Sequence, residues 1–260
     1  MKDIKIAFFD IDGTLVDFQL KRMTENTKKA LLGLKRKGIR ICIATGRTPM
    51  TIPHFSGVDF DGYLTFNGAY CYDDGGTIFS QPIPKGDVLR ILKNAEGLKR
   101  TVSVATKDDL GANGWEKNLS DYFEIANLKL ELSPRFDSLI AQDVYQLMVG
   151  CGPEEYDALL MGAPGAKIAA WWDRAVDVIP SAGGKGVGVA RMLEHFGLTQ
   201  DEAIAFGDGN NDIEMLQAVG TSVAMENGSQ ELKRIANFVA RPCAEDGIYR
   251  FCLEHGLIEE

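Results

Sequence analysis

The stretch Phe8-Phe9-Asp10-Ile11-Asp12-Gly13-Thr14-Leu15 decides how this chain is read. Apart from Lys5, residues 4–9 are apolar, which predicts a buried strand over 4–10 that delivers Asp10 and Asp12 at its C-terminal end. Ligands of open parallel sheets gather at these strand ends, and the i, i+2 spacing sends both side chains to one side of an extended chain. Two neighbouring acids repel unless a cation or a shared proton compensates, which indicates a divalent metal. Asp12-Gly13 is equally typical of a turn that ends a strand, and the pair alone does not decide between the two interpretations.

Composition narrows the class of protein. A chain of 260 residues suits one large domain or two modest ones. The formal net charge of -9 argues against nucleic acid or an anionic membrane as partner. The 5 cysteines form no C-x-x-C pair and their number is odd, which favours a reduced, cytoplasmic protein. No H-E-x-x-H spacing, signal peptide or apolar run of about 18 residues is visible, so we expect no zinc site and no membrane span.

Strands and helices alternate in the first and last parts of the chain, which predicts a doubly wound α/β core with a parallel sheet. The predicted core strands cover 4–10, 40–45, 63–66, 203–206, 222–224 and 238–240, with a hairpin at 69–79. The predicted core helices cover 25–37, 187–196, 212–219 and 230–236, and a last helix starts at Ile248.

Residues 84–182 differ, because strands there follow one another closely. Predicted strands cover 101–105, 128–132, 144–151, 167–172 and 176–179, and predicted helices cover 85–98 and 153–161. This pattern is typical of an α+β sheet with helices on one face. We therefore expect residues 1–83 and 183–260 to form the core, and 84–182 to form an inserted domain that covers a pocket, excludes water and selects a leaving group.

Three more polar clusters are expected beside Asp10 and Asp12 at the rim of the sheet, the edge that the carboxyl ends of its parallel strands form. They are Thr45-Gly46-Arg47, the Gly-flanked Lys185, and Gly207-Asp208-Gly209-Asn210-Asn211-Asp212. Carboxylates for Mg²⁺, a hydroxyl and backbone N–H groups for phosphate oxygens, and a lysine as point charge are what phosphoryl transfer requires. Oxygen-only ligands favour Mg²⁺ over zinc or copper.

Taken singly, each cluster has a simpler explanation. Thr45-Gly46 is typical of a strand-end turn, and the glycines around Lys185 are typical of a hinge. Asp208 to Asp212 partly imitate a calcium loop, but Ile213 stands where the required glycine would be and Val219 where the glutamate would be, which excludes an EF-hand.

D-I-D-G-T-L, I-A-T-G-R, the Gly-flanked Lys185 and F-G-D-G-N-N-D resemble, in order, the four motifs of haloacid dehalogenase superfamily phosphatases. F-N-G-A at 66–69 and the insert after the second motif are similar to the Cof-type subfamily with a type IIB cap. The resemblance implies a Rossmann-like core with an α+β cap.

The resemblance also implies residue roles. Asp10 would be the nucleophile that forms an aspartyl-phosphate, and Asp12 the general acid and base. Mg²⁺ would be held by the Asp10 carboxylate, the Asp12 backbone carbonyl and the Asp208 carboxylate, and Asp212 would orient metal-bound water. The implied phosphate or substrate contacts are Thr45, Gly46, Arg47, Asn67, Lys185 and Asn211. In the cap, the densest aromatic and charged group supplies Trp172, Arg174 and Asp177 as substrate candidates.

The leading prediction is a Mg²⁺-dependent phosphomonoester hydrolase acting on small phosphorylated metabolites, with sugar phosphates foremost. A phosphomutase is disfavoured because residues 15–24 are too few for the small helical insert of many mutases. A receiver-type module would lack the acid two residues after the nucleophile and would be about half this length. A sugar-phosphate-binding regulator with residual activity remains an alternative.

Overall fold

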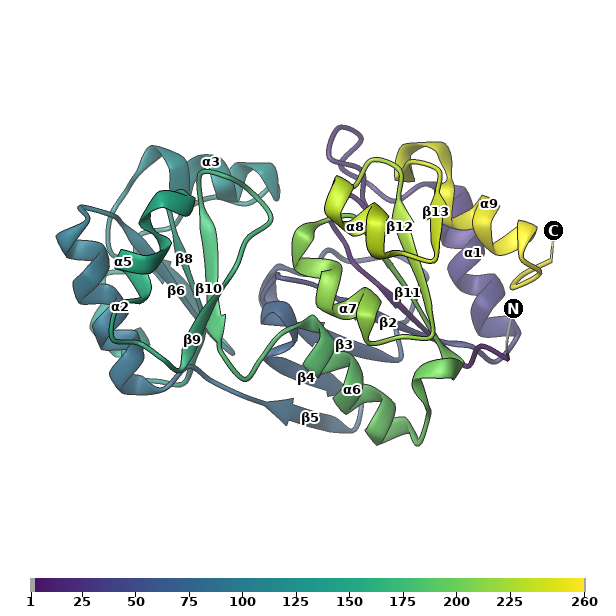
Figure 1. Ribbon diagram of the computed structural model, residues 1–260, viewed down its shortest axis with the longest axis horizontal. Coiled ribbons are helices and arrows are strands. Elements are labelled where there is room, and N and C mark those ends of the chain that lie inside the picture. The colour runs from purple at the N-terminus through teal and green to yellow at the C-terminus, as the bar shows by residue number, and fades with distance from the viewer. Residues whose placement is uncertain (1–2, 260) are drawn as a thin grey trace. The chain divides into compact units, whose positions relative to one another are not determined.

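The computed structural model describes residues 3–259 and divides the chain into two compact units (Figure 1). The first unit comprises the described residues of Met1–Thr45, Pro53–Phe79 and Lys185–Glu260. The second comprises Gly46–Ile52 and Ser80–Gly184, so the short segment 46–52 groups with the long insert.

The first unit is built on an 8-stranded sheet with the order β13-β12-β11-β1-β2-β3-β4-β5. Its strands are β1 (Ile6–Phe9), β2 (Arg40–Ala44), β3 (Gly62–Thr65), β4 (Tyr70–Asp73), β5 (Gly76–Ser80), β11 (Ala203–Gly207), β12 (Thr221–Met225) and β13 (Phe238–Ala240). Strands from β13 through β3 pair in parallel, while β4 returns antiparallel to β3. The chain winds from β1 toward β3 in one direction and from β11 toward β13 in the other. The carboxyl ends of β1 and β11 therefore flank a topological switch point, where ligands bind in such sheets.

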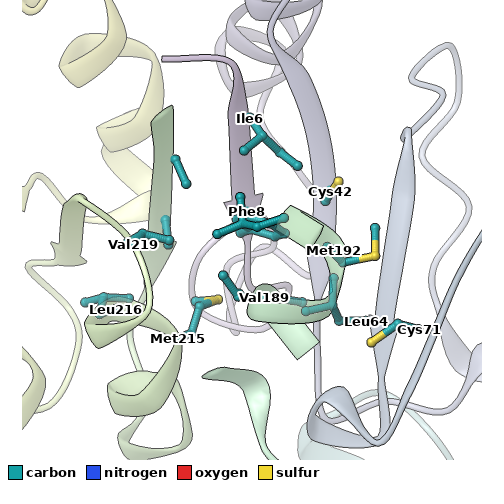
Figure 2. Packing of buried hydrophobic residues seen from close by; sticks show 14 of the residues in the cluster. Ile6, Phe8, Cys42, Leu64, Cys71, Val189, Met192, Met215, Leu216 and Val219 are labelled. Atoms are coloured by element: carbon teal, nitrogen blue, oxygen red, sulfur yellow. The ribbon is translucent and has the colours of Figure 1, made fainter. Parts of the chain in front are cut away.

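Helices cover both faces of this sheet, and the strands read as continuous apolar runs because both faces are buried. The helices are α1 (Glu25–Arg36), α6 (Lys185–Phe196), α7 (Ile213–Gln217), α8 (Gln230–Ile235) and α9 (Gly247–Glu254). Ile6 and Phe8 point to the face where Val189 and Met192 of α6 and Met215 of α7 complete a buried cluster (Figure 2).

Phe9, one residue on from Phe8, points to the opposite face of the sheet, as strand alternation requires. Its ring stacks on Phe206 of β11 at 5.1 Å, and Phe206 meets Phe251 of α9 edge to face at 5.5 Å. Together with the helix-covered parallel sheet, this packing confirms the predicted doubly wound α/β class.

The second unit contains a 5-stranded antiparallel sheet with the order β7-β6-β8-β10-β9. Its strands are β6 (Val102–Thr106), β7 (Leu110–Ala112), β8 (Val144–Val149), β9 (Ala166–Ala169) and β10 (Val176–Pro180). Its helices are α2 (Lys85–Gly97), α3 (Lys117–Ile125), α4 (Phe136–Ile140) and α5 (Tyr156–Leu160). A buried apolar cluster joins α2, α4 and α5 to one face of the sheet.

The predicted strand at 128–132 is wrong. Asn127 has a left-handed backbone (φ 58), and the Leu128 N–H closes the end of α3 by donating to Phe123 O. Only Leu132 pairs, in an isolated bridge to Ala112. Strand β7 and helices α3 and α4 were not predicted, and β9 ends at Ala169 rather than at Trp172.

Among residues 3–259, no helix combines the length and the apolar character that crossing a bilayer demands.

Candidate active site

The polar clusters of the first unit follow adjacent strands of its sheet. Asp10 directly follows β1 and continues the ladder, since its N–H donates to Phe206 O of β11 at 3.0 Å. Thr45 follows β2, Asp208 follows β11, and Lys185 is the first residue of α6. The parallel ladder thus brings these side chains to one rim, as the sequence predicted.

Lys185 connects two of the aspartates. Its ammonium Nζ lies 2.6 Å from Asp10 Oδ1 and 2.5 Å from Asp212 Oδ1, and only 1% of the residue is exposed. A buried ammonium is stable only when it is paired and hydrogen-bonded. The two carboxylates supply both conditions and fix the lysine beside the predicted nucleophile.

Asp212 also organises the loop that carries Asp208. Its Oδ2 accepts the backbone N–H groups of Asp208 and Gly209, each at 3.0 Å, while its Oδ1 faces Lys185. Both oxygens of Asp212 are therefore engaged by the protein itself. This favours a positioning role over direct metal ligation.

Asp208 is held from several sides. Thr14 Oγ1 donates to Asp208 Oδ1 at 3.2 Å, and the Ser229 N–H donates to the Asp208 carbonyl at 2.8 Å. Gly13 lies against the carboxylate with a left-handed backbone (φ 87), and a Cβ at that position would come within 2.1 Å of Asp208 Oδ2. Asn227 Nδ2 fixes this glycine by donating to its carbonyl at 2.8 Å. Only glycine combines that conformation with that close approach.

The acidic cluster fits Mg²⁺, with Asp10 and Asp208 as the candidate ligands and Asp212 behind them, since both oxygens of Asp212 are already engaged. One carboxylate oxygen from each of Asp10, Asp208 and Asp212 lies within 4.8 Å of the other two. Mg²⁺ is held in proteins through oxygen ligands, with one or two carboxylates and water. When all three acids are ionised, the single ammonium of Lys185 leaves an excess of negative charge that a divalent cation would balance.

The protonation of the acids reflects this excess. Burial raises the pKa of Asp10 from 3.8 to about 7, and the charges of Asp212 and Asp12 add to the rise while Lys185 opposes it. Burial, together with the charges of Asp10 and Asp212, holds the pKa of Asp208 well above its usual range. Burial would lower the pKa of Lys185, but the two adjacent carboxylates outweigh that effect and keep it above its ordinary value. Lys185 is thus a cation, whereas Asp10 and Asp208 need a further positive charge to ionise fully near neutral pH.

Thr45, Asn67 and Asn211 form a linked polar group beyond the ends of β2, β3 and β11, respectively. The Asn67 N–H donates to Thr45 O at 2.9 Å, and Asn211 Nδ2 donates to Asn67 Oδ1 at 3.1 Å. Asn67 is 1% exposed and has a left-handed backbone (φ 53), a conformation that asparagine tolerates better than most residues. The sequence predicted these residues separately but not the amide pair between Asn67 and Asn211.

Of the remaining predicted residues, Asp12 lies half-buried in the first unit, where its backbone forms an isolated bridge with Val16, and the others belong to the second unit. Gly46 and Arg47 lie in the segment 46–52, and the Arg47 guanidinium donates to Thr51 O at 2.9 Å and to Ala126 O at 2.8 Å. Arg174 lies 4.3 Å above the Trp172 ring and 3.6 Å from Asp121, and Asp177 is fully buried. Their predicted contacts with substrate stay predictions.

Two contributors were missed from the sequence. Thr14 stands inside the first motif but was given no role, although its hydroxyl contacts Asp208. Asn227 follows β12, just as the polar residues of the other motifs follow their strands. The Asn227-Gly228 pair at a strand end was the signal that would have identified it.

Comparison with known proteins yields consistent matches. A family model described as haloacid dehalogenase-like hydrolase matches residues 7–252. The putative phosphatase YkrA of Bacillus subtilis is 33% identical over 99% of this chain and 100% of its own length. The 5-amino-6-(5-phospho-D-ribitylamino)uracil phosphatase YitU of the same bacterium is 28% identical over 95% of both chains. Among solved structures, the HAD subclass IIB sugar phosphatase BT4131 superposes with a TM-score of 0.88 at 30% identity, over 98% of this chain and 100% of that one.

Proposed function

Because this chain belongs to the haloacid dehalogenase-like hydrolases and is a phosphatase of that superfamily, we propose that it hydrolyses small phosphomonoesters in a Mg²⁺-dependent reaction through an aspartyl-phosphate on Asp10. The observation that carries this proposal is the bridge of Lys185 between Asp10 and Asp212, beside the carboxylate of Asp208. A buried carboxylate held next to a fixed ammonium is poised to attack an electrophile that carries negative charge.

The first step makes Asp10 the nucleophile. Its carboxylate oxygen attacks phosphorus, the bond from phosphorus to the ester oxygen breaks, and Asp12 gives its proton to the departing oxygen. Mg²⁺, held by the Asp10 carboxylate, the Asp12 carbonyl and the Asp208 carboxylate, would neutralise charge on the phosphoryl group and on Asp10.

The second step releases phosphate. Asp12, now ionised, takes a proton from water, and that water attacks the phosphorus of the aspartyl-phosphate, which frees phosphate and restores Asp10. Lys185 has three N–H donors, of which Asp10 and Asp212 take two. We assign the third Lys185 donor to an oxygen of the phosphoryl group. The Thr45 hydroxyl and the Asn211 amide would contact the same phosphoryl group.

The proposed substrates are small phosphorylated metabolites, with sugar phosphates as the leading class. Support comes from the sugar phosphatase BT4131, at 30% identity over nearly the whole chain, and from YitU, whose name specifies a phosphorylated ribityl compound. The proposed location is the cytoplasm, in agreement with five cysteines that are all free and buried.

The test is steady-state release of phosphate from p-nitrophenyl phosphate, with Mg²⁺ and with EDTA. We expect turnover only with metal, and we expect Asp10→Asn to lower kcat by about 10³-fold or more, as loss of a nucleophile does in other enzymes. Asp74→Asn, the same change at an exposed acid, should retain full activity. Turnover by Asp10→Asn at the wild-type rate would remove the nucleophile assignment, and turnover in EDTA would remove the metal.

A further inference from the structure

The segment that follows β12 contacts both loops that carry candidate metal ligands. It consists of Asn227, Gly228 and Ser229, and we call it the 227–229 segment. One of the two loops follows β1 and carries Asp12, and the other follows β11 and carries Asp208. All of these residues belong to the first unit, and β12 pairs in parallel with β11. The 227–229 segment therefore lies at the same rim, although it belongs to none of the four polar clusters.

The Asn227 side chain joins two backbone segments. Its Nδ2 donates to the Gly13 carbonyl at 2.8 Å, and its Oδ1 accepts the N–H of Cys243 at 3.1 Å. Reversing the amide would place oxygen against oxygen and nitrogen against an N–H group, so the two partners fix its orientation. The residue is exposed, which means that its side chain is not needed to fill the core. What the side chain contributes is therefore this pair of hydrogen bonds.

Gly228 and Ser229 hold Asp208 by its backbone rather than by its carboxylate. The Ser229 N–H donates to the Asp208 carbonyl at 2.8 Å. A Cβ at position 228 would lie 2.6 Å from that carbonyl oxygen and 2.8 Å from the Asp208 Cα, too close to be accommodated without a shift. Glycine is thus required here by the close approach of two backbones. The segment is packed directly against the residue whose carboxylate faces the metal site.

Gly13 is the point at which the segment meets the loop after β1. The Gly13 N–H donates to Val16 O at 2.8 Å, which closes the turn of this loop from within. Asn227 holds the carbonyl of Gly13, and the preceding peptide bond carries the carbonyl of Asp12, a candidate metal ligand. The internal bond shapes the turn, whereas Asn227 ties the turn to the segment that holds Asp208.

We propose that Asn227 is a positioning residue of the Mg²⁺ site, which fixes the Asp12 carbonyl relative to the Asp208 carboxylate. It acts through other residues, because its amide holds Gly13 while the two residues that follow it hold the Asp208 backbone. Mg²⁺ demands nearly ideal octahedral geometry, so a small change in the spacing of two ligands costs affinity. This inference rests on the proposed Mg²⁺-dependent function and adds the contact that sets the spacing of the ligands.

The experiment begins with Asn227→Ala, which removes both hydrogen bonds and keeps every candidate ligand. We expect the dissociation constant for Mg²⁺, measured by calorimetry without substrate, to rise about fivefold, the equivalent of about 1 kcal/mol and of one typical hydrogen bond. Turnover of p-nitrophenyl phosphate should require about fivefold more Mg²⁺, but kcat at saturating Mg²⁺ should stay within about twofold of wild type. A loss of kcat that saturating Mg²⁺ does not restore would overturn the proposal.

Asn237→Ala is the matched control. Asn237 is also exposed, and its Oδ1 accepts the backbone N–H and the hydroxyl of Ser222 in β12, each at 2.9 Å. Both variants lose two hydrogen bonds beside the same strand, so urea unfolding should show losses of stability of the same order. Only Asn227→Ala should change the affinity for Mg²⁺. Unchanged affinity in Asn227→Ala, or the same loss of affinity in Asn237→Ala, would overturn the proposal.

Gly228→Ala tests the other end of the connection. Its Cβ must displace the Asp208 backbone, and we expect the affinity for Mg²⁺ to fall at least as far as in Asn227→Ala. Gly86→Ala, which has open space around the new Cβ, should bind Mg²⁺ as wild type does. Wild-type affinity in Gly228→Ala would contradict the role given to the 227–229 segment.

Two further measurements separate the possible failures. Hydrogen exchange of the metal-free protein should become faster in residues 11–16 of Asn227→Ala but not of Asn237→Ala, and unchanged exchange in both would overturn the proposal. Asn227-dependent affinity for Mg²⁺ in a protein that releases no phosphate would leave the inference standing while the proposed function failed. Phosphate release with the same Mg²⁺ requirement in wild type and Asn227→Ala would do the reverse.

Discussion

The rim of the parallel sheet and one face of the antiparallel sheet both bury polar groups, but they balance them in opposite ways. We call the second the polar face; it carries Ser103 of β6, Gln146 and Met148 of β8, and Asp177 of β10. At the rim, Lys185 and backbone N–H groups engage the carboxylates, and what remains is an excess of charge. On the polar face, Asp177 has a neutral donor, and what remains is one carbonyl oxygen without a partner. The first imbalance is one of charge, whereas the second is one of hydrogen bonding. The comparison therefore separates two different costs of burying polar groups.

The largest effect is expected from removing the cation of the rim. Lys185→Met leaves Asp10 and Asp212 buried without their shared partner, and breaking such a pair costs about 3–5 kcal/mol of unfolding free energy. Urea unfolding at neutral pH measures the loss. Because protonation removes the uncompensated charge, the deficit relative to wild type should shrink at about pH 5. Lys29→Met on the surface of α1 is the matched control, and a variant as stable as wild type would show that the rim does not depend on this charge balance.

A second variant tests the close approach at Asp208 without changing any charge. Gly13→Ala imposes a left-handed alanine, at a cost of about 1–3 kcal/mol, and pushes its Cβ against Asp208 Oδ2. We expect Mg²⁺ affinity, measured by calorimetry, to fall at least about tenfold. Gly38→Ala has the same backbone requirement (φ 76) with open space around the new Cβ, so it should lose stability but keep its metal affinity. Equal metal affinity in both variants would contradict the idea that the close approach of Gly13 positions the Asp208 carboxylate for the metal.

On the polar face, Tyr122→Phe should cost more stability than Gln146→Leu, although both remove one polar group. Tyr122→Phe leaves the fully buried Asp177 without its hydroxyl donor, at a cost of about 1–3 kcal/mol. Gln146→Leu removes an acceptor that had no donor. Thermal melts of the two variants give the ranking, and the reverse order would erase the contrast between the satisfied and the unsatisfied side chain.

The last effect, gradual because it is spread over several pH units, is a pH dependence of metal binding at the rim. A carboxyl pKa raised from 3.8 to about 7 means that the folded protein holds this proton more tightly than the unfolded chain does. Metal-free stability should therefore fall as pH rises from about 4 to about 7. Mg²⁺ must displace the proton, so its affinity should rise by up to about tenfold per pH unit below pH 7 and level off above it. Calorimetric titrations of wild type and Asp10→Asn check this, and an unchanged slope in Asp10→Asn would assign the proton to another acid.

The core was predictable because one pattern, an apolar run that ends in polar residues, marks these parallel strands in the sequence as well as in the folded sheet. Buried parallel strands are apolar on both faces, and their carboxyl ends carry Asp10, Thr45 and Asp208. The resemblance to haloacid dehalogenase phosphatases rested on these same ends, and it is confirmed.

The insert was less predictable because its antiparallel sheet uses short strands whose alternation is imitated elsewhere. Leu128, Leu130 and Leu132 alternate with charged residues just as a half-buried strand would. The segment nevertheless makes no ladder, since its first N–H ends α3 and only Ala112 pairs with its other end. The unpaired Oε1 of Gln146 was invisible for another reason: whether an amide finds a partner depends on neighbours that are distant in sequence.

The segment Gly46–Ile52 carries a practical consequence for exchanging parts between relatives. The second unit begins at Gly46, directly after Thr45. The Arg47 guanidinium donates hydrogen bonds to Thr51 O and Ala126 O, both in that unit. A chimaera that replaces residues 84–182 alone would exchange the segment that carries the Ala126 carbonyl, while it keeps Arg47, whose guanidinium is positioned to donate to that carbonyl. A functional exchange must therefore transplant two pieces of sequence together, the long insert and the seven residues that follow the threonine of the second motif.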